Sequence, residues 1–264
     1  TLLMRTIQTQ HSYIDVVKPL GVCVLLIACS LAIGCTSVSG SGRTQFNAYG
    51  VHEEIDLGER TYVEMIDGQS LIVEGRDFEM ITEVTRRIAH AAKRLHPEIA
   101  YEFDWEVVLI DDPDTANAWA LPGGKMAVYS GILPVTVDAD GLAVVMGHEA
   151  AHAIARHGGE NMTRAGMVGI FAAGVSAALD GEHDDVIGAA AMAYGLLGEP
   201  AFSRQQESEA DVLGLFITAE AGYDPRAAIG LWERMAERGG GTIEFLSTHP
   251  SEANRITELQ EIMP

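Results

Sequence analysis

His148-Glu149-Ala150-Ala151-His152 is the stretch of this 264-residue sequence that most restricts its fold and its chemistry. On an α-helix, residues four apart lie one above the other on the same face, so both imidazoles could bind one zinc ion. The glutamate between them could act as a base toward a water molecule on that ion. A coincidental pair of surface histidines is the alternative that the motif alone leaves open.

The sequence on both sides of the motif favours a helix. Asp140 can cap its start and Gly158-Gly159 can end it. Between these limits, residues recur at helical spacing: Leu142, Val145, Glu149, His152 and Arg156. We therefore expect the motif to lie on one helix, with both histidines on one face.

The composition is strongly acidic, with 38 Asp and Glu, 17 Lys and Arg, and a formal net charge of −21. Nucleic-acid binding needs a basic surface, so we expect no nucleic-acid partner. The same charge argues against electrostatic docking on anionic lipid. Its simplest role is to keep the protein soluble.

The N-terminal residues resemble a bacterial secretion signal. Arg5 and Lys18 precede an apolar run that ends in small residues at Gly34, which predicts a signal peptide over residues 1–34. Ala32-Ile33-Gly34-Cys35 resembles a lipobox, so Cys35 is the predicted lipidation site. A second match ends at Cys29, and an uncleaved membrane anchor or a plain signal peptide are further alternatives.

Lipidation would attach the chain to a membrane by its acyl chains alone. Thr36, which follows the cysteine, is typical of outer-membrane lipoproteins, so we expect a periplasmic protein anchored to the outer membrane. The three cysteines, Cys23, Cys29 and Cys35, all lie in this N-terminal region. The rest of the sequence can therefore contain neither a disulfide framework nor a Cys-based zinc site.

The remaining sequence predicts a flexible tether over 35–52, Ser/Gly-rich from Ser37 to Gly42, and one α+β domain over 53–264. Periodicity predicts helices over 53–66 and 77–95, the second capped by Asp77, and a strand over 101–110. A hairpin of strands 119–121 and 125–129 precedes the motif helix, and everything after the motif is expected to be helical. The Ala/Gly-rich segment 162–197 predicts two helices joined by a loop; a membrane-dipping hairpin or a lid are alternatives.

A catalytic zinc site usually has three protein ligands and keeps one position for water. Suitable side chains follow the motif at His157, Glu160, Glu182, His183, Glu199, Glu207 and Glu209. Glu207 is the strongest candidate, because Ser203 with Gln206 resembles a capping box that starts a helix there. Asp211 lies one helical turn further on and could accept a hydrogen bond from the far nitrogen of a ligand histidine. A solvated acidic turn is the alternative.

Several motifs occur in order along the chain: Asn117–Gly124, His148–His152, Ser203-Arg204 with Glu207, Ala210 and Asp211, then Ala221–Pro225, and Thr248-His249-Pro250 with Arg255. This combination resembles the minigluzincin zinc endopeptidases, relatives of the CAAX prenyl proteases. The sequence has no multi-span segment, and so resembles the soluble periplasmic branch of the β-barrel assembly-enhancing proteases. The resemblance implies one Zn²⁺ bound by His148, His152 and Glu207, with Glu149 as the base.

The expected reaction is hydrolysis of peptide bonds in misfolded or stalled cell-envelope proteins, with unfolded or misassembled envelope proteins as the partners. Trp119, Ala120 and Leu121 could pair with an extended substrate as an added strand, although an ordinary core hairpin with Trp119 buried is equally consistent with the sequence. The resemblance suggests that His249 binds the transition state or closes the open zinc position. Arg255 could stabilise charge at the reacting carbonyl or form a surface salt bridge.

Two other classes of function remain open at this stage. The first is a latent protease that acts mainly as a chaperone or assembly factor for outer-membrane proteins. The second is a metal-free helical lipoprotein that binds other proteins, and metal analysis would separate it from the rest.

Overall fold

Helix α6, Ala139–Ile154, runs through the middle of the protein and carries the His148–His152 motif. The computed structural model describes residues 35–178, 202–238, 244–249 and 255–263. The predicted signal peptide, residues 1–34, and part of the Ala/Gly-rich segment, residues 179–197, lie outside this range. Side chains from Gly141 to Ile154 are all buried, so α6 is surrounded by other elements on every side.

The sheet next to α6 has four strands in the order β3-β4-β6-β5. These are β3 (Leu71–Ile72), β4 (Glu106–Ile110), β5 (Ala118–Leu121) and β6 (Lys125–Tyr129). Strand β4 pairs parallel with β6, and the other two pairs are antiparallel. The predicted hairpin is confirmed as β5–β6, with β5 at the edge of the sheet, and its turn contains Gly123 and Gly124 with positive φ.

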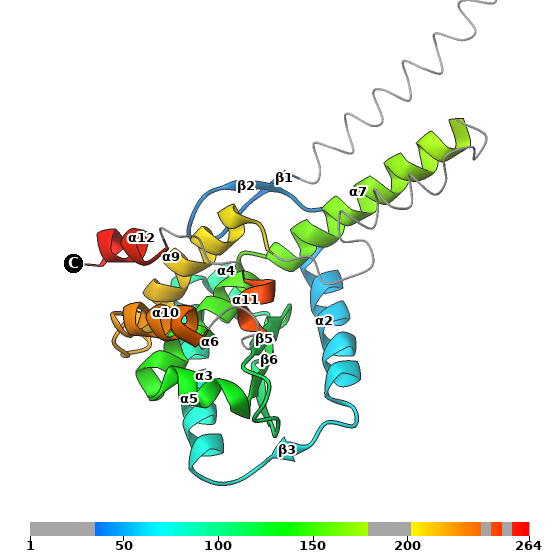
Figure 1. The fold of residues 1–264 in the computed structure, drawn as a ribbon. Helices are drawn as coiled ribbons and strands as arrows, with labels where there is room; N and C mark the ends of the chain where they lie inside the picture. The colour runs from blue at the N-terminus through cyan, green and yellow to red at the C-terminus, as the bar shows by residue number, and fades with distance from the viewer. Residues whose placement is uncertain (1–34, 179–201, 239–243, 250–254, 264) are drawn as a thin grey trace, which may run out of the picture.

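Helices cover this sheet and α6, and the α+β class is confirmed (Figure 1). Those before the sheet hairpin are α2 (Val51–Ile66), α3 (Arg76–Leu95) and α4 (Pro97–Ala100). Between the hairpin and α6 lie η1 (Ser130–Ile132) and α5 (Leu133–Thr136). After α6 come α7 (His157–Ala178), α9 (Arg204–Glu220), α10 (Ala227–Arg238), α11 (Phe245–Thr248) and α12 (Arg255–Ile262).

Several boundaries differ from those expected. Strand β4 begins at Glu106 rather than at Tyr101, because its partner β6 begins at Lys125, opposite Glu106. Helix α3 has Gly75, not Asp77, at its N-cap. Helix α6 is capped by Asp138, whose Oδ1 accepts a hydrogen bond from Gly141 N at 3.0 Å.

Asp140, the expected cap of α6, instead accepts a hydrogen bond from the backbone N–H of Asp224 at 3.0 Å. The end of α6 also differs: the chain turns at Arg156, where φ is +60°, and α7 begins at once. Gly158 and Gly159 therefore lie within α7. A side chain at Gly159 would overlap Glu54 of α2, so this glycine permits close packing instead of ending a helix.

Residues 35–52, expected to be a flexible tether, contain regular secondary structure. Strands β1 (Cys35–Ser37) and β2 (Thr44–Phe46) pair as an antiparallel hairpin, and α2 begins at Val51. Val38, Gln45 and Asn47 are buried, and Gln45 donates a hydrogen bond to the carbonyl of Ala155 at 3.1 Å. This N-terminal hairpin is thus attached to the segment that directly follows the motif helix.

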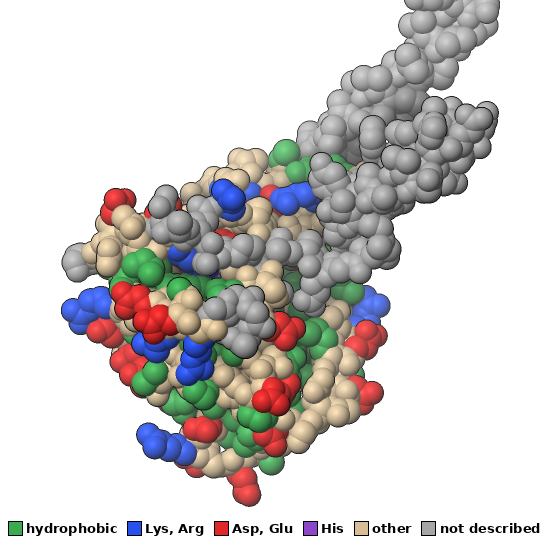
Figure 2. Space-filling view, in the orientation of Figure 1, with side chains coloured by type: hydrophobic (Ala, Val, Ile, Leu, Met, Phe, Trp, Pro, Cys, Tyr) green, Lys and Arg blue, Asp and Glu red, His purple; other side chains and the backbone are tan. Residues whose placement is uncertain are grey.

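No single helix in the described ranges is long and apolar enough to cross a membrane. One bent pair, Ser130–Thr136 with α6, meets the requirement by length and composition alone, and α6 is buried within the protein. On the face drawn in Figure 2, acidic and basic side chains are interspersed, as expected for a solvated surface.

Candidate metal centre

Two glycines bring α9 against α6 at the level of the motif. A Cβ at Gly214 of α9 would lie 2.8 Å from the backbone nitrogen of His148, and one at Gly147 would lie 2.5 Å from Thr218 Oγ1. The predicted capping box is confirmed at the start of α9, since Ser203 and Gln206 hydrogen-bond each other's backbone. One turn into this helix, Glu207 therefore comes beside the two histidines.

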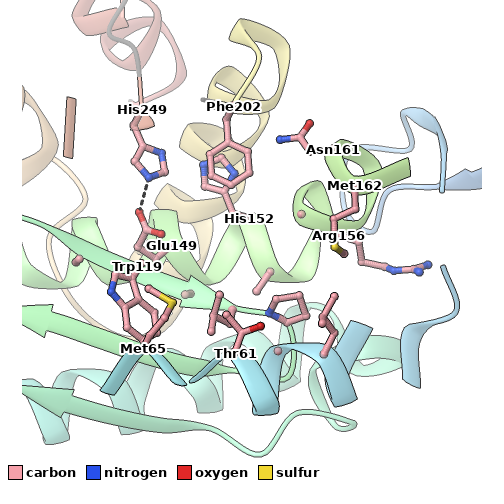
Figure 3. Close-up of a pocket in the computed structure, with 18 of the residues that line it drawn as sticks. Thr61, Met65, Trp119, Glu149, His152, Arg156, Asn161, Met162, Phe202 and His249 are labelled. Atoms are coloured by element: carbon pink, nitrogen blue, oxygen red, sulfur yellow. Dashed lines mark ion pairs between the residues drawn. The ribbon is translucent and has the colours of Figure 1, made fainter. Parts of the chain in front are cut away.

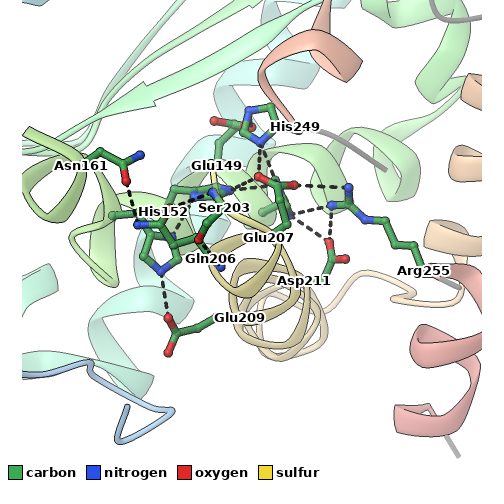
Figure 4. A network of polar contacts seen from close by, with 12 residues as sticks. Glu149, His152, Asn161, Ser203, Gln206, Glu207, Glu209, Asp211, His249 and Arg255 are labelled. Carbon is green, nitrogen blue, oxygen red and sulfur yellow. Dashed lines mark hydrogen bonds and ion pairs between the residues drawn. The ribbon is translucent and has the colours of Figure 1, made fainter. Parts of the chain in front are cut away.

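Four buried side chains meet at one point between these helices. Ligand atoms of His148, His152, Glu207 and His249 all lie within 4.8 Å of one another. Glu207 Oε2 lies 3.5 Å from His148 Nε2, and Glu207 Oε1 lies 3.4 Å from His152 Nε2. The structure thus brings the three predicted ligands together. Figure 4 shows Glu207 with His152 and His249 next to it.

The donor set fits a single zinc ion. His148 Nε2 and His152 Nε2 lie 3.1 Å apart, while their Nδ1 atoms contact Asp211 at 3.0 Å and His157 at 2.8 Å. If each Nδ1–H donates outward, the two Nε2 lone pairs point toward each other, and a cation between them removes that repulsion. Glu207 Oε2 is buried and accepts no hydrogen bond from any described residue. Two histidine nitrogens and one carboxylate oxygen are a typical donor set for zinc. The outer ring nitrogens of the histidines in such sites are usually hydrogen-bonded, as they are here.

The charges around His148 also favour a cation. Burial lowers the pKa of His148, but the carboxylates of Asp211 and Glu207 outweigh this effect and raise it to about 9. Burial tends to raise the pKa of Glu207, yet the neighbouring imidazoles of His148, His152 and His249 hold it well below its ordinary value. An environment that favours an added proton on an imidazole also favours a metal cation there.

Glu149 lies on the same helix, beside the ligand group. It is 2% exposed, and burial raises the pKa of its carboxyl above the ordinary value. A backbone hydrogen bond from Ala120 of β5 opposes this shift. Figure 3 shows Glu149 facing His249, whose Nε2 lies 3.3 Å from Glu149 Oε1. The carboxylate is therefore held between the edge strand and the C-terminal part of the chain.

His249 lies directly after α11 and is 2% exposed. Its Nδ1 lies 3.0 Å from Glu207 Oε1 and 3.2 Å from His148 Nε2. Phe245, four residues earlier, stacks on its ring at a centroid distance of 4.4 Å. The imidazole therefore occupies a fourth corner of the ligand group.

Arg255, at the start of α12, holds two carboxylates from behind the ligands. Its Nη2 donates to Asp211 Oδ1 at 2.5 Å, and its Nη1 lies 3.3 Å from Glu207 Oε2. Its guanidinium also packs 3.5 Å above the ring of Trp232. Because Arg255 is only 5% exposed, the surface salt bridge that the sequence allowed is wrong.

A pocket of about 410 Å³ opens beside Glu149 and His152. Strand β5 lines it with Ala118 to Leu121, and α2 forms a second wall with Leu57, Thr61 and Met65 (Figure 3). Trp119 is half-buried, and its ring meets Tyr62 edge to face. The edge strand and the buried ligand group therefore share one mostly apolar pocket.

Some contributors to the site had no sequence signal. Phe202 stacks on His152 at a centroid distance of 3.9 Å, and Thr61 and Met65 reach the pocket from α2, far upstream of the motif. Of the other ligand candidates, His157, Glu160 and Glu209 lie outside the ligand group. Glu182, His183 and Glu199 lie outside the described residues.

Comparisons with known proteins agree with this geometry. Residues 76–263 match the model of peptidase family M48. The chain is 44% identical over 168 residues to the mitochondrial metalloendopeptidase OMA1 of Schizosaccharomyces pombe. This match covers 62% of this chain and 48% of that protein. It is also 27% identical over 256 residues to metalloprotease LoiP of Escherichia coli, and this match covers 90% of this chain and 96% of that protein.

A putative beta-barrel assembly-enhancing protease of Vibrio cholerae is 32% identical over 159 residues, covering 55% of this chain and 32% of that protein. The chain spans about half the length of the yeast OMA1 proteins that it matches. The family match covers the ligand group, Glu149 and the edge strand. The resemblance to zinc endopeptidases expected from the sequence is thereby confirmed: the chain belongs to peptidase family M48.

Proposed function

We propose that the protein is a zinc-dependent endopeptidase. The observation that carries this proposal is the convergence of His148, His152 and Glu207 within 4.8 Å, with Glu149 beside them. In this proposal the first three side chains hold the ion. Asp211 fixes the orientation of His148, since it contacts the ring nitrogen that faces away from the ligand group.

Glu149 acts as the general base in this mechanism. When bound, zinc supplies a Lewis acid that acidifies water and polarises a peptide carbonyl. The Glu149 carboxylate takes a proton from the attacking water and delivers it to the leaving amine. Burial, which raises the pKa of Glu149, brings its proton affinity closer to that needed for both transfers. Arg255 keeps Glu207 and Asp211 in place by its contacts with both.

The substrate is an extended peptide that pairs with β5. Trp119, Ala120 and Leu121 lie on the edge strand and line the pocket beside Glu149. Main-chain hydrogen bonds along an edge would give affinity with little dependence on sequence. The wall formed by Leu57 and Met65 favours apolar substrate side chains.

The substrates that we propose are misfolded or stalled proteins of a bacterial cell envelope. Support comes from the similarity to metalloprotease LoiP and to a putative beta-barrel assembly-enhancing protease. The lipobox-like residues before Cys35 support a periplasmic protein held to the outer membrane by lipid. Exposed apolar segments distinguish misfolded proteins from folded ones, which agrees with the apolar pocket wall.

Metal removal tests the proposed activity. We expect the zinc-loaded protein to cleave casein and an unfolded outer-membrane protein, and dialysis against a chelator to abolish cleavage because Glu149 alone cannot activate water. Fragments resolved by mass spectrometry report the cleavage, and added Zn²⁺ should restore it. Cleavage that continues at the same rate after the metal is removed would contradict a zinc mechanism.

The position of His249 favours a second candidate function, a latent protease that serves mainly as an assembly factor. Its Nδ1 contacts the ligand group while its Nε2 faces Glu149, so the ring stands where water and a substrate carbonyl would have to enter. A site closed in this way is active only in the fraction of molecules where the histidine has moved.

His249→Ala separates gating from a role in the reaction. We expect this variant to keep its zinc and to cleave casein severalfold faster than wild type, because the fraction of open sites rises. Peptidase rate and zinc content are measured together, with Ser247→Ala on the same turn as the control. A fall in the rate with zinc retained would contradict gating and favour transition-state binding by His249.

A further inference from the structure

A second histidine continues outward from ligand His152. His157 Nδ1 lies 2.8 Å from His152 Nδ1, and His157 Nε2 lies 2.9 Å from Glu209 Oε2. The His157 side chain is completely buried, and Phe202 packs near both rings. His157 therefore contacts the one nitrogen of His152 that does not face the ligand group.

If His152 binds a cation through Nε2, the hydrogen bonds that run from His152 through His157 to Glu209 can have only one direction. Its Nδ1 then carries the hydrogen and donates to Nδ1 of His157. The remaining proton of His157 lies on Nε2 and is donated to the carboxylate of Glu209. A negative charge at Glu209 thus supports both hydrogen bonds and makes Nε2 of His152 a stronger donor to a metal.

Glu209 is held in place by the N-terminal hairpin. Ser41 of this hairpin donates a hydrogen bond to Oε1 of Glu209, while Oε2 faces His157. Nε of Arg43 donates to Glu209 at 2.8 Å, and its two Nη atoms donate to Glu160 of α7 at 2.9 and 2.8 Å. Arg43 therefore separates two carboxylates that would otherwise repel each other in a mostly buried place.

These contacts have no part in the mechanism above, although they end on one of its ligands. We propose that His157, Glu209 and Arg43 are positioning residues, and that through them the N-terminal hairpin, residues 35–46, sets the orientation and zinc affinity of His152. This inference requires the proposed metal site but not peptidase activity. Zinc binding at His152 becomes dependent on a segment that lies over 100 residues upstream and outside the part of the chain matched by the family model, residues 76–263.

Asn and Gln at position 157 would each keep one of the two hydrogen bonds that His157 makes. The side-chain oxygen of Asn can occupy the place of Nδ1 and accept from His152, whereas the nitrogen of Gln can occupy the place of Nε2 and donate to Glu209. We expect His157→Gln to weaken zinc binding about 10–100-fold, as loss of an outer hydrogen-bond partner does, and His157→Asn to keep most of the affinity. Competition with a chromophoric chelator measures the dissociation constant.

Arg43→Gln tests the hairpin end of the chain. We expect it to weaken zinc binding in the same direction, because Glu209 would no longer be held against His157. Arg86→Gln is the matched control, since Arg86 pairs with Glu83 on the exposed face of α3. Visible spectra of the cobalt-substituted proteins report ligand geometry directly, so the site can be compared even where thermal stability falls.

Equal zinc affinity of His157→Gln and wild type would overturn the proposal. Tighter zinc binding by His157→Gln than by His157→Asn would also overturn it, because that result would mean that the contact of His157 with Glu209 matters and its contact with His152 does not. If Arg43→Gln left the zinc affinity and the cobalt spectrum unchanged, the N-terminal hairpin would have no influence on His152. Wild-type protein that binds no zinc would instead refute the metal site itself, so the two failures are distinct.

Discussion

Replacing Glu149 with Gln is expected to reduce peptidase turnover by about 10²–10⁴-fold while zinc stays bound. The amide has the shape of the carboxylate but cannot take a proton from the attacking water. Glu149 is not in the ligand group, so the ion should keep all its ligands. Casein cleavage and zinc content, measured on the same preparation, check both halves of this expectation.

Glu233→Gln provides a matched control, because Glu233 lies exposed on α10 and is not in the ligand group. It should leave cleavage and zinc content as in wild type. Retained turnover in zinc-loaded Glu149→Gln protein would rule out Glu149 as the base. Loss of zinc from this variant would show that the carboxylate supports the site in some other way.

The same inactive variant can hold an uncut peptide and so locate the substrate. We expect the peptide to lie along β5, antiparallel or parallel to Trp119–Leu121, with an apolar side chain against the α2 wall. A crystal structure of the complex with the peptide bound away from this edge would contradict strand addition. In that case the α2 wall would need another role.

The parts of the site carried by short-range patterns could be predicted from the sequence. The capping box at Ser203 and Gln206 determined where α9 starts, and with it the face on which Glu207 and Asp211 lie. The turn at Gly123-Gly124 likewise indicated the hairpin and placed β5 before the motif helix. In each case a local backbone requirement has a recognisable residue signature.

Features that depend on contacts between distant segments could not be predicted in this way. Gly159 looked like a helix end, but it is small because Glu54, about a hundred residues earlier, packs against it. Asp140 looked like a cap, but it binds the backbone of Asp224. Glycine and aspartate each satisfy several physical requirements, and only the tertiary partner decides which one applies.

The N-terminal hairpin illustrates the same limit at the level of a whole segment. Ser37 to Gly42 has the composition of a flexible linker. Yet Arg43, immediately after it, meets carboxylates from α7 and α9, and Gln45 meets the backbone of Ala155. Polar partners that lie over 100 residues away leave no trace in local composition, so the pattern indicated a tether where the structure has a paired hairpin.

Replacing Glu207 with Ala should have the largest effect on metal content. It removes one of three proposed ligands and leaves the guanidinium of Arg255, which lies beside His148, with only Asp211 to balance its charge. We expect the zinc dissociation constant to rise beyond the roughly 10–100-fold that loss of an outer hydrogen-bond partner causes, and cleavage to vanish with the metal.

Two further variants on α9 make the result specific to Glu207. Asp211→Asn keeps the ligands but weakens the hold on His148, so it should lose affinity only within that 10–100-fold range. Glu220→Ala removes a carboxylate that pairs with Arg94 near the end of the same helix, and should leave zinc binding unchanged. If Glu207→Ala retained zinc as tightly as Glu220→Ala, the third ligand would have to be His249, whose Nδ1 already lies 3.2 Å from His148 Nε2, and the site would be a three-histidine centre.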